Sequence, residues 1–143
     1  MILKHQWVIW SLFSALFAGA TAVLAKIGVA GMDSNLATAV RTSVILVFTW
    51  AIVIATDSRK GISNIGPRAW LFLVFSGLAT GLSWLCYFRA LQLGQASRVA
   101  PIDKLSVVFV ILFAAAFLGE RITFAKAFGG FLIVAGAIVL AWE

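Results

Sequence analysis

Five charged side chains lie inside long apolar stretches of the sequence, where a charge is costly unless it has a partner or a function. They are Lys26, Arg41, Arg89, Asp103 and Lys104. A charge placed in lipid costs at least a few kcal/mol, so such residues pair with one another or line the path of a substrate or ion. The same stretches add two aromatic candidates for that pathway, Trp84 and Tyr87. Trp84 lies in mid-stretch, where packing inside a helix bundle is the favoured explanation.

A purely structural interpretation of the basic residues has equal support. Lys26, Arg41 and Lys104 each lie four or five residues inside an expected helix end. At about 1.5 Å per residue that is roughly 6–8 Å, a distance that long basic side chains can largely bridge to reach the lipid headgroups.

Asp103 differs because its side chain is too short to reach the headgroups. We expect it to be buried and paired with a cation, either from the first three helices or with Lys104 across a dimer. Such a structural ion pair competes with a second interpretation, in which Asp103 belongs to a transported-ion site.

The composition requires that most of the chain face lipid. Of 143 residues, 63% are hydrophobic and 11% charged, and the mean hydropathy is +1.08, whereas soluble domains are about half apolar and a quarter charged. A span needs roughly 20 apolar residues. The apolar runs predict an all-α membrane protein, a single domain over residues 1–143, with a bundle of five transmembrane helices at about 7–30, 36–56, 69–91, 99–118 and 124–142.

Turn and small residues divide and shape these helices. Ser34 or Asn35 is the expected N-cap of the second helix, and Pro101 is expected in the first turn of the fourth, where a missing N–H is harmless. Glycines expected to allow close helix packing lie in the third and fifth helices: Gly77, Gly81, Gly129, Gly130 and Gly136. For the third helix, packing within the chain is favoured over dimerisation.

The net charge of +6 predicts membrane topology rather than nucleic-acid binding. The N-terminus, the loop between the second and third helices and the loop between the fourth and fifth helices share one side of the membrane. They carry Lys4, Arg59, Lys60, Arg68, Arg121 and Lys126. The opposite loops carry Arg98 alone, so the N-terminus is expected in the cytoplasm. Residues near span ends bring the tally to six against five, which leaves a mixed orientation open.

Nothing in the sequence predicts an enzyme. His5 is the single histidine and Cys86 the single cysteine, which argues against a histidine-based triad, a zinc site and a disulfide within the chain. No glycine-rich phosphate loop is present. We therefore expect no catalytic residue, no metal and no cofactor.

Two sequence segments resemble a known family. The stretch 90–102, A-L-Q-L-G-Q-A-S-R-V-A-P-I, is similar to a segment of EamA domains, which belong to the drug/metabolite transporter superfamily. The stretch 117–123, F-L-G-E-R-I-T, resembles a second signature of that family, and Lys26 and Arg41 match the basic residues usual in its first two helices.

The resemblance is to the five-helix subgroup in particular. The stretch 101–106, P-I-D-K-L-S, is similar to that subgroup, and Val107 stands where the ten-helix members usually have proline. The last helix also resembles that of small multidrug resistance proteins, which carry an acidic residue at the place of Ala18. Its absence argues against a proton-coupled antiporter of that type.

The resemblance implies a half-transporter: a secondary transporter of small metabolites across the cytoplasmic (inner) membrane. The expected partners are membrane lipids, a small-molecule substrate and a second half-transporter, in a homodimer or heterodimer, with no nucleic acid. The alternative is a non-transporting membrane subunit that binds lipid or assembles with another membrane complex.

Overall fold

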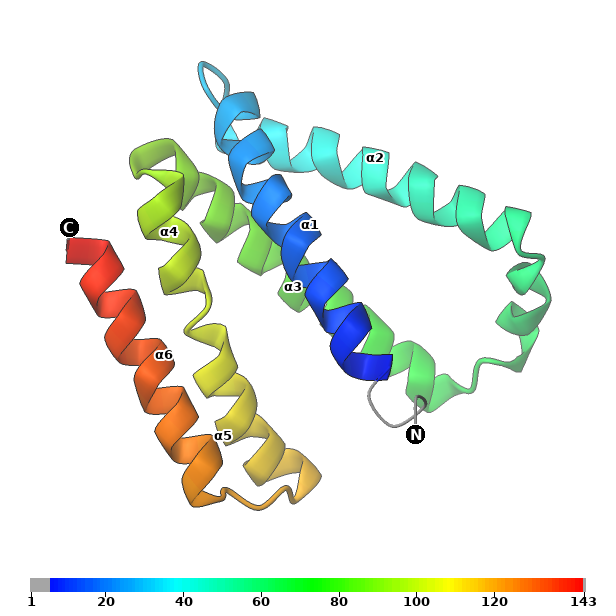
Figure 1. Cartoon of the computed structure of the whole chain (residues 1–143). Helices are drawn as coiled ribbons and strands as arrows, with labels where there is room; N and C mark the ends of the chain where they lie inside the picture. Colours follow the sequence, from blue (N-terminus) through cyan, green and yellow to red (C-terminus); the bar gives the residue numbers. More distant parts are fainter. Residues whose placement is uncertain (1–5, 143) are drawn as a thin grey trace. The chain divides into compact units, whose positions relative to one another are not determined.

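The computed structural model describes residues 6–142, a range built of helices and short connections (Figure 1). Lys4 and His5 lie outside the described residues. The elements are α1 (Gln6–Gly28), α2 (Ser34–Ala55), the 3₁₀ segment η2 (Ser58–Asn64), α3 (Pro67–Leu93), α4 (Ala96–Asp103), α5 (Ser106–Leu118) and α6 (Phe124–Trp142).

Within the described range, five stretches are long and apolar enough to span a membrane, with α4 and α5 together forming one, Ala96–Leu118. Many of their large apolar side chains are exposed, such as Phe117 and Trp142, which suits a surface in contact with lipid. The predicted fold class, an all-α membrane protein with five transmembrane helices, is confirmed. The chain is a multi-pass membrane protein.

The start of α2 is capped by a residue that we did not predict. Asp33 Oδ1 accepts hydrogen bonds from the backbone N–H groups of Asn35 (2.9 Å) and Leu36 (3.0 Å). The expectation of a Ser34 or Asn35 cap is therefore wrong. A carboxylate at this position pairs with free N–H groups and with the positive end of the helix dipole, so the carboxylate of Asp33 is already engaged.

The fourth span is broken in its middle, although one continuous helix was expected. α4 ends at Asp103 and α5 begins at Ser106. Across the break the backbone tightens to bonds three residues apart: Leu105 N–H to Ile102 O at 3.0 Å and Val108 N–H to Leu105 O at 2.9 Å.

Pro101 does not occupy the first turn of this span, as the sequence had suggested. α4 begins at Ala96, so Pro101 is the sixth residue of the helix and lies in its interior. Its missing N–H removes a bond that the carbonyl of Ser97 would otherwise accept, which weakens the helix just before the break.

By its contacts the chain divides into two compact units. The terminal unit combines the residues up to Ile27 with those from Leu93 onward, and the central unit is Gly28–Gln92. In the terminal unit α4 runs closely along α6 (Figure 1). Gly130 and Ala137, two turns apart on α6, are buried. A Cβ atom at Gly130 would meet the side chains of Ile111 at 3.6 Å and Val108 at 3.9 Å, so α5 packs there as well.

In the central unit, α2 connects to α3 through η2 (Figure 1). The connection turns at Asp57, whose φ of 54° is left-handed. The Asp57 carboxylate pairs with Arg59 at 3.4 Å and also with Lys60. Both basic residues of this loop are thus partly neutralised, while their side chains stay exposed.

Candidate functional site

Arg41 on α2 lies against two aromatic rings of α3. Its guanidinium carbon is 4.3 Å from the ring centroid of Trp84 and 5.5 Å from that of Phe88. The two aromatic residues are one helical turn apart, so they present their rings on one face of α3. We call these three residues the Arg41 site. A cation over an aromatic face is stabilised by the ring quadrupole, and more so where water is scarce.

The carboxylates of the central unit are occupied elsewhere. Asp33 caps α2, and Asp57 pairs with Arg59 and Lys60. Among residues 28–92, no carboxylate forms an ion pair with Arg41. The positive charge of Arg41 is therefore held in a membrane span by aromatic rings rather than by an acidic partner.

Hydroxyl groups near Arg41 donate to their own helix. Thr38 Oγ1 donates to the Ser34 carbonyl at 2.8 Å, and Thr42 Oγ1 donates to the Thr38 carbonyl at 2.7 Å. Tyr87 lies close enough to interact electrostatically with Arg41. Since the two threonine protons are used, the guanidinium is the strongest hydrogen-bond donor that this face of α2 can offer to a ligand.

Arg89 has a structural role in the central unit. Its Nη1 donates to Gln92 Oε1 at 2.8 Å, and Gln92 Nε2 donates to the Met32 carbonyl at 2.6 Å. This chain of bonds ties the end of α3 to the turn before α2.

Each charged pathway candidate of the terminal unit has a partner within the unit. Lys26 Nζ donates to the Gly94 carbonyl at 2.8 Å, joining α1 to the turn before α4. Asp103 contacts its neighbour Lys104 at 3.5 Å, with the side chains 39% and 58% exposed respectively. Burial of Asp103 in the assembled protein, with a cation from another helix or across a dimer, stays a prediction. Asp103 lies at the helix break, where its side chain remains accessible.

The predicted packing glycines fall into two groups. Gly130 packs against α5, as described above. At Gly77 and Gly81, no side chain and no other helix of the central unit would lie within 4 Å of an added Cβ atom, and the same holds for Gly129 and Gly136 within the terminal unit. The expected packing of Gly77 and Gly81 within the chain is therefore not seen inside their own unit.

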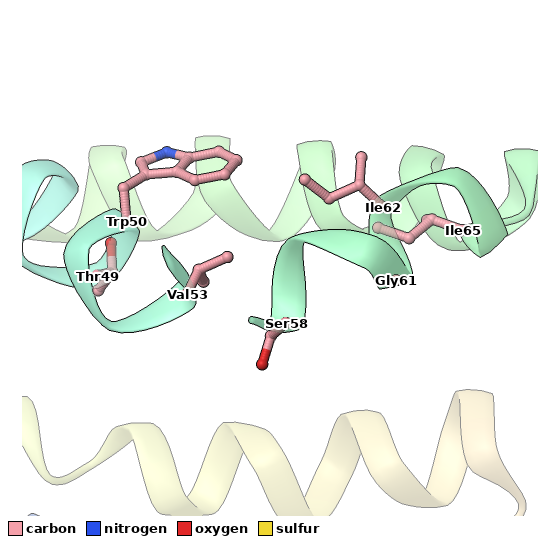
Figure 2. Close-up of a pocket in the computed structure, with 7 residues that line it drawn as sticks. All are labelled: Thr49, Trp50, Val53, Ser58, Gly61, Ile62 and Ile65. Atoms are coloured by element: carbon pink, nitrogen blue, oxygen red, sulfur yellow. The ribbon is translucent and has the colours of Figure 1, made fainter. Parts of the chain in front are cut away.

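An open pocket of about 220 Å³ lies at the other end of α2 (Figure 2). Trp50 and Val53 of α2 line one side, and Ile62 and Ile65 line the other. Its remaining lining residues are Thr49, Ser58 and Gly61. None of the charged pathway candidates lines this pocket, so its chemistry suits an apolar group. Within residues 6–142, no group of three His, Cys, Asp or Glu side chains could hold a metal ion.

Sequence reasoning identified Arg41 and Trp84 separately but did not join them, and it missed Phe88. The available signal was the spacing W-x-x-x-F at 84–88, which places two rings on one helix face. The spacing does not say which neighbouring helix that face meets.

Comparison with known proteins agrees with the resemblance of the sequence motifs. The chain matches the model of the EamA-like transporter family over residues 5–142. An uncharacterized transporter in the cobO 3' region of a Sinorhizobium species is 53% identical over 139 residues, which cover 97% of this chain and 99% of the relative. No solved structure matches the chain. With the family model covering nearly all of its residues, the chain belongs to the EamA-like transporter family.

Proposed function

We propose that this chain is one half of a secondary transporter that moves small metabolites across the cytoplasmic membrane, and that it is not an enzyme. The observation that carries this proposal is the match to a relative of nearly the same length that is named a transporter. The five apolar spans support it, because they supply the membrane-embedded helices from which such pathways are built.

The working unit that we propose is a dimer, either of two copies or with a homologous half-transporter. Many secondary transporters place their substrate between two repeats of inverted topology. Five spans make up one such repeat, so we propose that a second, oppositely inserted chain supplies the inverted counterpart. Gly129 and Gly136, two turns apart on α6, have no atom of the terminal unit near their Cβ positions and leave that helix face bare for a close contact.

The orientation that we propose has the N-terminus in the cytoplasm. The loop basic residues on that side are six, against Arg98 alone on the other. Including the near-end cations reduces this bias to six against five, which is weak enough to allow insertion in both directions.

Reconstitution tests the transport function. The purified chain is placed in proteoliposomes and assayed for uptake of a panel of radiolabelled metabolites, with protein-free liposomes as the control. Saturable uptake of at least one solute is expected. A chain that is folded and correctly inserted but moves none of the panel, alone or with a homologous partner, would favour the non-transporting membrane subunit instead.

Cysteine labelling tests the antiparallel dimer. Cys86→Ser removes the native thiol, and either Ser63→Cys in η2 or Gln95→Cys before α4 places a new one at an exposed position. Labelling of each variant from both sides of the membrane is expected for dual insertion. Labelling from one side only, combined with full transport by the chain alone, would exclude an antiparallel homodimer.

A further inference from the structure

We infer that the Arg41 site binds an oxyanion, a carboxylate or phosphate group, and that the transported substrates are small organic anions. The inference rests on the proposed transport function for its second part only. Its physical basis is a guanidinium in a membrane span that lies on aromatic rings while the carboxylates of its unit are engaged with other groups.

The contact with Trp84 leaves the N–H groups of the Arg41 guanidinium available to a ligand. The guanidinium carbon of Arg41 lies over the ring of Trp84, 4.3 Å from its centroid. The guanidinium carries five N–H donors and an aromatic ring offers no oxygen acceptor, so this contact leaves N–H groups available to a ligand. Those N–H groups form a fork that matches two oxygens of a carboxylate or phosphate. The aromatic rings thus orient a donor that still lacks an anionic acceptor within residues 28–92.

Location also favours a bound anion. Arg41 is the eighth residue of α2, about 10 Å along the helix from its first residue. At that depth Coulomb attraction is stronger than in water, because the surroundings have a lower dielectric constant. An incoming anion would therefore gain most from a cation whose charge no acidic neighbour offsets. The anion could be a soluble metabolite or the phosphate of a lipid headgroup, since both offer the same oxygens.

The test measures oxyanion binding by the full chain in nanodiscs of zwitterionic phosphatidylcholine. The midpoint of thermal unfolding is followed in inorganic phosphate and in glutarate, against chloride at equal ionic strength. Both oxyanions are expected to raise the unfolding midpoint of the native chain. In Arg41→Gln the apparent Kd for each oxyanion is expected to rise by about tenfold or more. Arg41→Lys keeps the charge without the fork and is expected to fall between them.

Arg68→Gln is the matched control. Arg68 also lies over an aromatic ring, Phe72 at 5.9 Å, but at the start of α3 and outside the proposed site. It is expected to keep the oxyanion response of the native chain. An equal loss in both variants would overturn the inference, because any removal of a stacked cation would then have the same effect. A full response in Arg41→Gln would overturn it directly.

A lipid comparison separates the two sources of the anion. The measurement is repeated in nanodiscs that contain phosphatidylglycerol. If this lipid stabilises the native chain through Arg41 and soluble oxyanions do not, the ligand of the oxyanion site is a lipid headgroup. The inference that the transported substrates are anions is then wrong. If neither source acts through Arg41, the oxyanion site itself is excluded.

Failure of this inference can be told apart from failure of the proposed function. Uptake of an uncharged metabolite that Arg41→Gln leaves unchanged would keep the transporter and overturn the anionic substrate class. Oxyanion binding at Arg41 by a chain that moves no solute would keep the site and overturn the transporter.

Discussion

In the terminal unit Asp103 lies beside Lys104 and Glu120 beside Lys126, at 3.5 and 2.8 Å, whereas in the central unit Arg41 lies against aromatic rings. The helices of the two units also meet differently. α6 packs on α4 and α5 through small residues such as Gly130, while α2 reaches α3 through the long side chain of Arg41.

This difference indicates a division of labour. A unit whose helices pack through small residues, and whose span carboxylate Asp103 pairs with its neighbour Lys104, is suited to be a scaffold or an assembly surface. A unit that holds a cation without an acidic neighbour can respond to an anion that arrives from outside. We therefore expect ligand binding in the central unit and helix association in the terminal unit. Four substitutions, each with a control variant, test this expectation.

The largest effect is expected when Arg41 in the central unit is given a neighbouring carboxylate, as Lys104 has in the terminal unit. Thr38 precedes Arg41 by three residues on the same face of α2. In Thr38→Asp a fixed carboxylate should pair with the guanidinium and weaken oxyanion binding by tenfold or more, about 1.4 kcal/mol. The shift of the unfolding midpoint in glutarate measures this loss.

Thr38→Asn is the matched control for that substitution. It removes the same hydroxyl, which donates to Ser34, and adds a side chain of the same size without charge. Oxyanion binding is expected to survive in it. Equal binding in Thr38→Asp and Thr38→Asn would show that a free charge on Arg41 is not what attracts the anion.

The second effect concerns the stability of the terminal unit. Gly130→Leu inserts a side chain where Ile111 and Val108 lie 3.6 and 3.9 Å from a Cβ, so it should lower the free energy of unfolding by about 1–3 kcal/mol. Unfolding in a denaturing detergent measures it.

Gly136→Leu serves as the comparison on the other face of α6. No atom of the terminal unit crowds that position, so this variant should unfold like the native chain and should instead weaken the dimer in cross-linking. The reverse pattern, with Gly136→Leu destabilising the monomer, would contradict the assignment of the two faces.

The five spans could be predicted because a span depends on length and composition, which are local properties. The partners of the charges could not, because they depend on which helix faces meet. Four cations stood at the same nominal depth as Asp103, and the sequence did not say which of them would pair with it; within its own unit the partner is its neighbour Lys104. The position of Pro101 was misjudged for a related reason: its effect depends on where α4 begins, and that end extends into the preceding turn.

A smaller effect is expected from the aromatic part of the Arg41 site. Trp84→Leu removes the closer of the two rings, and a cation–π contact is worth about 0.5–2 kcal/mol. Only the part of that energy that orients the guanidinium bears on binding, so oxyanion affinity should fall by less than about tenfold. Trp70→Leu, at an exposed position near the start of α3, is the control and should bind normally. Tighter binding in Trp84→Leu would mean that the ring competes with the anion for the Arg41 guanidinium instead of orienting that group.

The smallest effect on the free energy of unfolding is expected for a substitution of Asp103, and a large effect there would contradict the comparison of the two units. A buried ion pair that loses one partner typically costs about 3–5 kcal/mol, but Asp103 and Lys104 are 39% and 58% exposed and adjacent in sequence. Pairs of this kind contribute about 0–1 kcal/mol. Asp103→Asn should therefore change the free energy of unfolding of the monomeric chain by less than about 1 kcal/mol, measured beside Lys126→Gln, which removes the other local pair. A much larger loss for Asp103→Asn alone would mean that this carboxylate is buried in the assembled membrane protein. The helix break at Asp103 would then join Arg41 as a second place where charge serves the pathway.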